Sequence, residues 1–325
     1  MSTPTHDTSR EPGVLGDPTA PVGSRLKGLL TAVPTWALWI VVILWTIPTL
    51  GLFVSSFRPV SDIQTSGWWT ALWNPNFTLD NYQEILFEET GGSIPLWESF
   101  LNSLAIAVPA TIIPVFVAAF AAYGFAWMNF PGRNWLFVAV VSLMALPNQM
   151  AFVPLLRLFR SGASFTIPFT DFTLKVFPAL DSISGESTSV WLIHIAFGLP
   201  LAIFLLHNYM SNLPRDLIEA ARIDGASHFV IFWRLIVPLS RPALAAFAVF
   251  QFLWTWNDYL IALIFLDPGN DTPLTIAIVN LVGERGENFQ LRFSAAFVSI
   301  SLPLVVFFGL QKHFVRGLLA GSVKG

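Results

Sequence analysis

Residues 211–238 read SNLPRDLIEAARIDGASHFVIFWRLIVP and contain the clearest local structural pattern in the chain. Pro214 suits the first position of a helix, and Asp216 would then lie in the first turn, where the helix dipole favours an anion. Gly225 stands where the end of that helix needs a left-handed residue. Ser227 can cap a second helix. The pattern therefore predicts two short helices joined by a glycine turn.

Both predicted helices carry apolar side chains on one face. On the first, Leu217, Ile218 and Ala221 form a single stripe. On the second, apolar residues recur at i, i+3, i+4 and i+7 spacing, and they are Phe229, Phe232, Trp233 and Ile236. We expect Pro238 to end this second helix. One interpretation of the unit is an amphipathic helix pair lying on a membrane surface.

The composition around this segment is that of a membrane protein. Of 325 residues, 54% are hydrophobic and only 11% are charged, whereas soluble domains carry about 25% charged residues. The chain has 30 Phe and 13 Trp, no Cys and a net charge of −3, so nothing favours a nucleic-acid partner, a disulfide framework or a thiol nucleophile. Six apolar segments are long enough to span a bilayer. They are residues 32–54, 99–128, 135–156, 190–210, 243–266 and 295–315.

These segments predict an all-α membrane protein with a simple organisation. Residues 1–30 are polar and aperiodic, typical of a disordered cytoplasmic tail. Residues 31–325 form one transmembrane domain, in which residues 211–242 are a cytoplasmic loop. If both termini are cytoplasmic, the loops on the cytoplasmic side hold more Lys and Arg than the external loops. Because cytoplasmic loops of membrane proteins carry an excess of Lys and Arg, this distribution favours cytoplasmic termini. We therefore expect a multi-pass membrane protein with both termini in the cytoplasm.

The 211–242 loop resembles the EAA motif of ABC importer permeases, whose fold is a type I permease of six transmembrane helices. The resemblance is carried by Glu219-Ala220-Ala221, by Asp224-Gly225-Ala226 and by Pro238. In that family the loop forms a coupling helix that sits in a groove of the ATPase subunit. The resemblance thus implies a coupling role for Glu219, Ala220, Ala221, Asp224, Gly225, Ala226, Phe229, Phe232, Trp233 and Pro238.

Other segments are similar to the carbohydrate class of these permeases. Asn102-Ser103, Ala121-Ala122-Tyr123 and the segment FPGR at 130–133 resemble the second maltose-type permease. Residues 197–206 (FGLPLAIFLL) and 251–258 (QFLWTWND) resemble α-glucoside permeases. The resemblance implies uptake of an α-glucoside or related oligosaccharide, with a second permease subunit, a cytoplasmic ATPase dimer, an external sugar-binding protein and membrane lipid as partners. The segment at residues 163–189 is longer than the usual family connection.

The C-terminal segment also matches this family. Residues 315–325 read VRGLLAGSVKG, a short basic tail with a flexible Ala-Gly-Ser segment. The resemblance implies that Gly321, Ser322 and Lys324 contact the ATPase.

Several polar residues interrupt the predicted spans. Pro147 precedes Asn148 and Gln149, which puts a helix break beside two amides, as in transport pathways. The other isolated polar or aromatic residues are His194, Gln251, Trp254, Asn257 and Asp258. Ionisable groups inside a membrane are costly and usually face a cavity or a partner. They are candidates for a substrate path, although packing contacts or a subunit interface would explain them equally well.

The motifs that the chain lacks limit its chemistry. No G-x-x-x-x-G-K-[ST], H-E-x-x-H or G-x-S-x-G segment occurs, so the sequence offers no nucleotide site, zinc site, catalytic residue or cofactor of its own. ATP would be bound by a partner subunit. Two alternatives remain: a proton-coupled secondary carrier using Asp258 or His194, and a membrane enzyme acting on lipid-linked sugar through Glu88 and Glu89. The absence of an inverted pair of broken helices disfavours the carrier.

Overall fold

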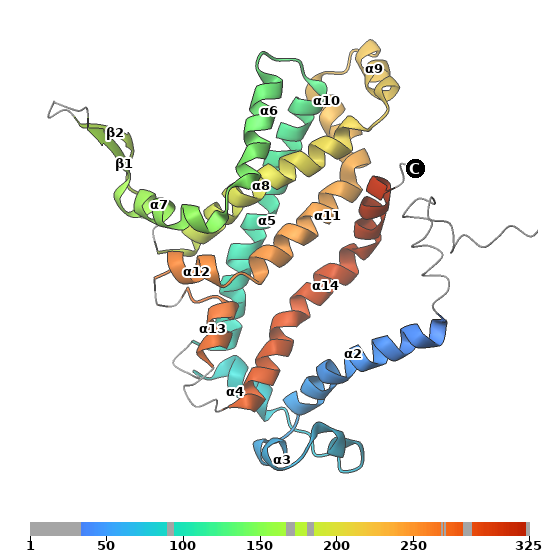
Figure 1. Cartoon of the computed structure of the whole chain (residues 1–325), viewed down its shortest axis with the longest axis vertical. Helices are drawn as coiled ribbons and strands as arrows, with labels where there is room; N and C mark the ends of the chain where they lie inside the picture. Colours follow the sequence, from blue (N-terminus) through green and yellow to red (C-terminus); the bar gives the residue numbers. More distant parts are fainter. Residues whose placement is uncertain are drawn as a thin grey trace, which may run out of the picture.

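The structure is a computed structural model that describes residues 34–89, 94–166, 173–180, 185–267, 269, 271–281 and 288–322. The predicted tail, residues 1–30, lies outside the described residues. The described chain is an elongated helical bundle with one small β-hairpin at its side (Figure 1).

Within the described residues, five helical segments are long and apolar enough to cross a membrane, and a bent pair of helices would supply a sixth span. The long helices are α2 (Thr35–Ser56), α5 (Leu96–Trp127), α8 (Ser187–Ser211), α11 (Val237–Trp256) and α14 (Phe289–Ser322). The first, second, fourth and sixth predicted spans agree with α2, α5, α8 and α14, apart from their end residues.

The third predicted span is bent. Helix α6 (Arg133–Ser142) continues into a short 3-10 turn, η3 (Leu143–Ala145), and is followed by α7 (Asn148–Ser161). The two halves meet at 101°. Pro147 lies between them in extended backbone, with ψ at 119°. This confirms the predicted break beside Asn148 and Gln149.

The fifth span differs from the prediction. Helix α10 (His228–Ile231) continues through a π-helical turn, η4 (Phe232–Ile236), into α11, and the helix ends at Trp256 rather than at 266. The prediction that Pro238 ends a helix is therefore wrong. In an α-helix, the ring of Pro238 would clash with the carbonyl of Arg234. The π-helical turn just before Pro238 pairs each carbonyl with an amide five residues on, which bypasses the missing N–H.

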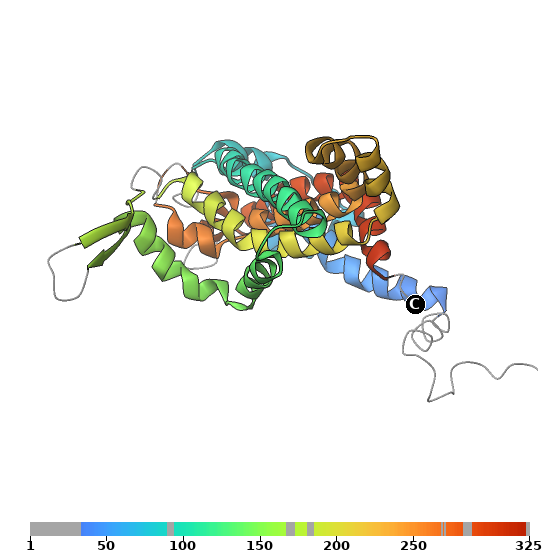
Figure 2. The ribbon, with the colours of Figure 1, turned by 90° about the horizontal axis from the view of Figure 1, so that it is seen from above.

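Helix α5 is the centre of the bundle, with α8 and α11 packed against it, while α14 packs on α11 (Figures 1 and 2). One core cluster lies where α5 and α8 meet the 211–236 segment, and a second joins α5, α11 and α14 to α13 (Leu274–Asn280). Helix α2 contacts α14 near its C-terminal end, where Ser294 Oγ donates to Ser56 O, and most of α2 is exposed. The bundle therefore presents α2 to lipid or to another chain.

The remaining elements connect the long helices. They are α3 (Val60–Thr65), η2 (Trp68–Leu72), α4 (Asp80–Phe87), α9 (Arg215–Ile223), α12 (Leu260–Phe265) and α13 (Leu274–Asn280). Strands β1 (Ala163–Thr166) and β2 (Thr173–Phe177) form an antiparallel hairpin in which Ser164 pairs with Lys175, and the hairpin projects away from the bundle (Figure 2).

The connection after α2 is organised around a buried arginine. The guanidinium of Arg58 donates to the backbone oxygens of Asp62 and Ser66 and to the hydroxyls of Ser66 and Thr70. The Asn81 side chain also donates to the Arg58 carbonyl. These bonds hold α3 and η2 against the end of α2, so the segment is an ordered cap rather than a loose loop.

Candidate functional site

Residues 211–227 form the helix and the turn that their sequence predicts. Helix α9 begins at Arg215, one residue later than expected, and Asp216 lies in its first turn. Within the predicted apolar stripe, Ile218 is buried against the bundle, whereas Leu217 is 44% exposed. Figure 1 shows α9 at one end of the molecule, beyond the ends of α5 and α8.

The turn after α9 has the conformation that the sequence predicts. Gly225 adopts a φ of +77°, a value that only glycine reaches without strain. The Gly225 amide donates to Arg222 O and the Ala226 amide donates to Ala221 O, both at 3.0 Å. The hydroxyl of Ser227 accepts from Val230 N at 3.4 Å and caps α10. The turn therefore has a fixed geometry.

Most of the predicted coupling residues lie on the outer surface of this unit. Glu219, Ala220 and Asp224 are exposed, and Ala221, Ala226 and Pro238 are half-buried. Ile223 is 86% exposed, although the sequence prediction did not include it. Its spacing of four residues from Glu219 puts both on one helix face, and this spacing could have identified it.

The three aromatic residues with an expected coupling role differ in their exposure. Phe229 is 68% exposed and Trp233 is 37% exposed, whereas Phe232 is 2% exposed. The Phe232 ring stacks on Phe120 of α5 with a centroid distance of 4.4 Å. Phe232 is therefore a core residue of the π-helical turn, whereas Phe229 and Trp233 reach the surface.

Two hydrogen bonds tie this unit to the end of α5. Arg222 Nη2 donates to Trp127 O at 3.1 Å, and the Tyr123 hydroxyl lies 2.8 Å from His228 Nδ1. Arg222 and His228 stand on opposite sides of the Gly225 turn, so both of its arms contact one helix.

The C-terminal candidates lie at the end of α14. Gly321 and Ser322 have helical backbone, so the expected flexible segment is helical as far as Ser322. Lys324 lies outside the described residues.

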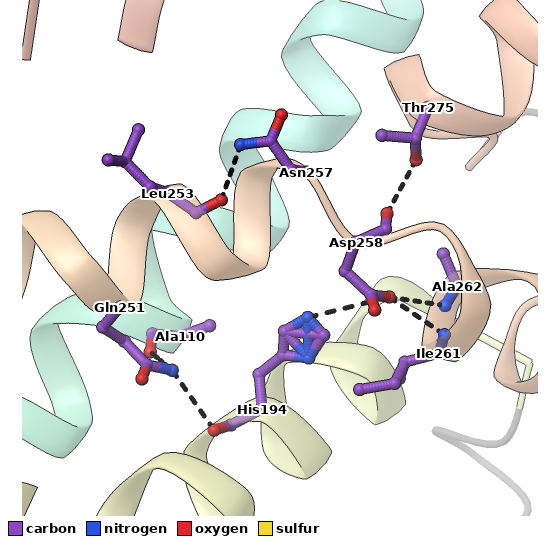
Figure 3. A network of polar contacts seen from close by, with 9 residues as sticks. All are labelled: Ala110, His194, Gln251, Leu253, Asn257, Asp258, Ile261, Ala262 and Thr275. Carbon is purple, nitrogen blue, oxygen red and sulfur yellow. Dashed lines mark hydrogen bonds and ion pairs between the residues drawn. The ribbon is translucent and has the colours of Figure 1, made fainter. Parts of the chain in front are cut away.

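A polar cluster brings together four of the residues predicted for a substrate path. Figure 3 shows His194 from α8 with Gln251 and Asp258 from the α11 side, and the fourth residue, Trp254 of α11, stacks on His194. His194 is fully buried, and its ring stacks on Trp254 at a centroid distance of 5.5 Å and an interplanar angle of 6°. Its Nε2 lies 3.9 Å from Asp258 Oδ2, which is longer than a hydrogen bond.

Asp258 caps a helix. Its Oδ2 accepts from Ile261 N at 2.9 Å and from Ala262 N at 3.3 Å, which satisfies the first turn of α12. Its carbonyl accepts from the Thr275 hydroxyl at 2.8 Å. The neighbouring Asn257 donates to Leu253 O of its own helix (Figure 3). A capping role therefore accounts for the one carboxylate in the cluster.

Gln251 compensates for a proline in a neighbouring helix. A proline at position 114 cannot donate to the carbonyl four residues earlier, which is Ala110 O. Gln251 Nε2 donates to this carbonyl at 3.1 Å and to His194 O at 3.3 Å. A Cβ on Gly198 would lie 2.5 Å from Gln251 Oε1, so glycine makes room for the amide. Gln251 thus joins α5, α8 and α11.

Trp256 makes an equivalent contact to α14. Pro303 deprives Ser299 O of its usual helical donor, and Trp256 Nε1 donates to Ser299 O at 3.0 Å. Helix α11 therefore supplies a side-chain donor to a proline-freed carbonyl in each of two neighbouring helices. The sequence prediction missed this role for both residues.

The two amides at the bend of the third span are separate from this cluster. Asn148 is half-buried and Gln149 is exposed, both in the first turn of α7. Since His194 and Gln251 are enclosed, the described structure does not join the seven path candidates into one open passage. No group of three His, Cys, Asp or Glu residues in the described ranges could hold a metal ion.

Comparisons with known proteins agree on one family. A family model described as "Binding-protein-dependent transport system inner membrane component" matches residues 114–319. The "Osmoprotective compounds uptake permease protein GgtD" of Synechocystis sp. is 51% identical over 293 residues, which cover 89% of this chain and 90% of that protein. The "Alpha-glucoside transport system permease protein AglG" of Rhizobium meliloti is 50% identical over 278 residues, which cover 83% and 68%.

A solved structure has the same fold. One chain of a bacterial ABC transporter involved in the import of the acidic polysaccharide alginate aligns with a TM-score of 0.66 at 19% identity. The alignment covers 92% of this chain and 100% of that one.

Proposed function

Because the chain belongs to the family of inner membrane components of binding-protein-dependent transport systems, we propose that it passes an α-glucoside or a related oligosaccharide across the membrane. It is a permease of a sugar-importing ABC transporter and not an enzyme. The proton-coupled alternative has no support.

The observation that carries the sugar assignment is the 50% identity to a permease named for α-glucoside transport. The segments at residues 197–206 and 251–258, which resemble α-glucoside permeases, lie in α8 and at the end of α11. These helices meet at Gln251 and His194 in the middle of the bundle. The similarity therefore extends to the core of the bundle.

The coupling step is assigned to α9 and the turn that follows it. Glu219, Ile223 and Asp224 project from the end of the bundle, with the exposed ring of Phe229 on the next helix. Exposed apolar groups beside charges are typical of a docking surface. We assign this surface, and the C-terminal end of α14, to the contact with a separate ATPase. We also propose that both termini and the 211–242 loop lie in the cytoplasm.

A second permease subunit would account for the exposure of α2. Only 6% of the apolar window of this helix is buried. A partner permease packed on α2 would complete a heterodimer that encloses the sugar path between the two chains. The external binding protein would then deliver sugar to the opposite end of the bundle from α9.

Uptake by the whole transporter tests the sugar assignment. The permease is co-purified with its own partners in mild detergent and reconstituted in liposomes, and uptake of labelled maltose, sucrose and trehalose is measured with ATP. We expect uptake that needs ATP and is unaffected by a proton uncoupler. Uptake abolished by the uncoupler, or restricted to solutes other than these sugars, would contradict the proposal.

A pair of glycine variants tests the coupling loop. Gly225 and Gly132 both have positive φ, at +77° and +79°, and in both an added Cβ meets nothing within 4 Å. Valine at either position therefore adds backbone strain of about 1 kcal/mol or more without a clash. We expect Gly225→Val to lose ATPase co-purification and uptake at normal membrane abundance, and Gly132→Val to keep both. Equal behaviour of the two variants would refute the assignment.

A further inference from the structure

The coupling unit is held to α5 by side chains on both sides of its turn. Arg222, at the end of α9, donates a hydrogen bond to Trp127 O in the last turn of α5. His228, at the start of α10, bonds to the Tyr123 hydroxyl one turn earlier on α5. These contacts are 95 and 105 residues apart in sequence. The loop is therefore connected to a helix that is neither of its chain neighbours.

The Tyr123 side chain combines a buried ring with this one hydrogen bond from its hydroxyl. It is 5% exposed, and its ring packs edge-on against Phe232 at a centroid distance of 5.4 Å. The packing fixes the ring, while the hydroxyl reaches His228 Nδ1 at the protein surface. Loss of the hydroxyl alone would leave the ring contacts in place.

The loop is also connected to its own chain neighbours. On one side, a turn at Asn212–Pro214 separates α8 from α9. On the other side, the π-helical turn at Phe232–Ile236 joins α10 to α11 in one helix, and such turns inside α-helices are frequent at functional sites. A displacement of α9 and α10 would therefore reach α11 along the chain and α5 through the side chains of Arg222 and His228.

The far end of α5 is attached to the opposite face of the bundle. Ser103 Oγ accepts from Leu274 N at 2.8 Å, and Asn102 Nδ2 donates to Thr272 O at 3.3 Å. Leu274 is the first residue of α13, and Thr272 lies just before that helix. A 32-residue helix spans about 48 Å. Helix α5 thus joins the coupling loop at one end to the α13 connection at the other.

We propose that Tyr123 and His228 are a positioning pair that transmits movement of the coupling loop to α5. The proposal rests on the proposed function, since it assumes that an ATPase moves the loop. Neither residue touches the sugar or ATP. The pair sets how much of the movement of the ATPase reaches the sugar path, so its loss uncouples ATP hydrolysis from transport.

Tyr123→Phe in the complete reconstituted transporter tests the pair. ATPase co-purification and ATPase activity should stay at wild-type values, because the docking surface at Glu219 and Ile223 is unchanged. Sugar uptake should fall, so that the ratio of ATP hydrolysed to sugar imported rises roughly three- to tenfold, the range expected for loss of one hydrogen bond. A structural defect alone would lower both activities and leave this ratio unchanged.

Three further single variants and one double variant sharpen the test. His228→Leu should raise the ratio as Tyr123→Phe does, and the double variant should be no worse than either single one. His228→Asn keeps an acceptor near the position of Nδ1 and should restore the wild-type ratio. Tyr209→Phe is the matched control, because the Tyr209 hydroxyl donates to Leu239 O at 3.2 Å, between α8 and α11 and away from α5.

A wild-type ratio of ATP hydrolysed to sugar imported in Tyr123→Phe would overturn the proposed role of the pair. Loss of ATPase co-purification in that variant would overturn it too. An equal rise in Tyr209→Phe would also overturn it. Failure of the proposed function has a different signature, because the wild-type transporter would then show no ATP-dependent sugar uptake.

Discussion

Replacement of Gln251 by Met should destabilise the bundle, because a carbonyl on another helix would lose its hydrogen-bond donor. Met is unbranched and apolar, and it fills space without donating a hydrogen bond. In the structure, Gln251 is fully buried and donates to Ala110 O at 3.1 Å, the carbonyl that Pro114 leaves without a helical donor. The variant therefore loses a bond and leaves a buried acceptor unpaired.

The size of the effect follows from those two losses. Hydrogen bonds between membrane helices contribute about 0.6 kcal/mol on average and about 1.7 kcal/mol at most. An unpaired buried acceptor costs roughly 1–3 kcal/mol. We expect Gln251→Met to lower the free energy of unfolding by about 1–2 kcal/mol. The exposed Gln149 is the matched control, and Gln149→Met should stay within about 0.5 kcal/mol of wild type.

A second substitution isolates the mechanism. Pro114→Ala restores a backbone N–H that can donate to Ala110 O within α5. In that background, Gln251→Met should cost less, with an interaction energy of about 1 kcal/mol in the double-mutant cycle. The assay is unfolding in mixed micelles with increasing SDS, followed by helical circular dichroism. If the cost of the double variant equals the sum of the two single costs to within about 0.3–0.5 kcal/mol, the link between Gln251 and Pro114 is refuted.

Three further predictions concern other buried polar contacts. Trp256→Phe should destabilise the bundle by about 1 kcal/mol, and Pro303→Ala should reduce that cost in the same SDS assay. Asp258→Ala removes the cap of α12 and should cost about 1 kcal/mol, whereas Asp258→Asn should cost less. Arg58→Met leaves several oxygens without a donor, so limited proteolysis should cut residues 57–81 faster while the long helices stay protected.

The sequence alone predicts the long helices well, because their apolar runs do not depend on which neighbour they meet. The break at Pro147 was predictable for the same local reason. The continuous helix from His228 to Trp256 was not, since Pro238 normally ends a helix. Here the π-helical turn that precedes the proline accommodates it, and no local residue pattern indicates such a turn.

The candidate site was predictable only in part, for a physical reason. The turn at Gly225 depends on its own φ, so the glycine identified it. The inward position of Phe232 depends on Phe120, and the role of Gln251 depends on Ala110, a residue 141 positions away. An isolated amide in an apolar span indicates a buried polar contact, but its partner becomes visible only when the helices are packed.

The π-helical turn at Phe232–Ile236 also separates two parts of the chain that should tolerate changes in length differently. A π-helical turn holds one residue more than an α-helical turn, so deletion of one residue there would leave the orientation of α11 nearly unchanged. Within α11, successive residues are rotated by about 100°, so deletion of one residue between Pro238 and Gln251 would turn Gln251 and Trp256 away from Ala110 O and Ser299 O. Insertions and deletions should therefore be excluded from that part of α11 in working relatives, even where individual residues on the exposed face are freely exchanged.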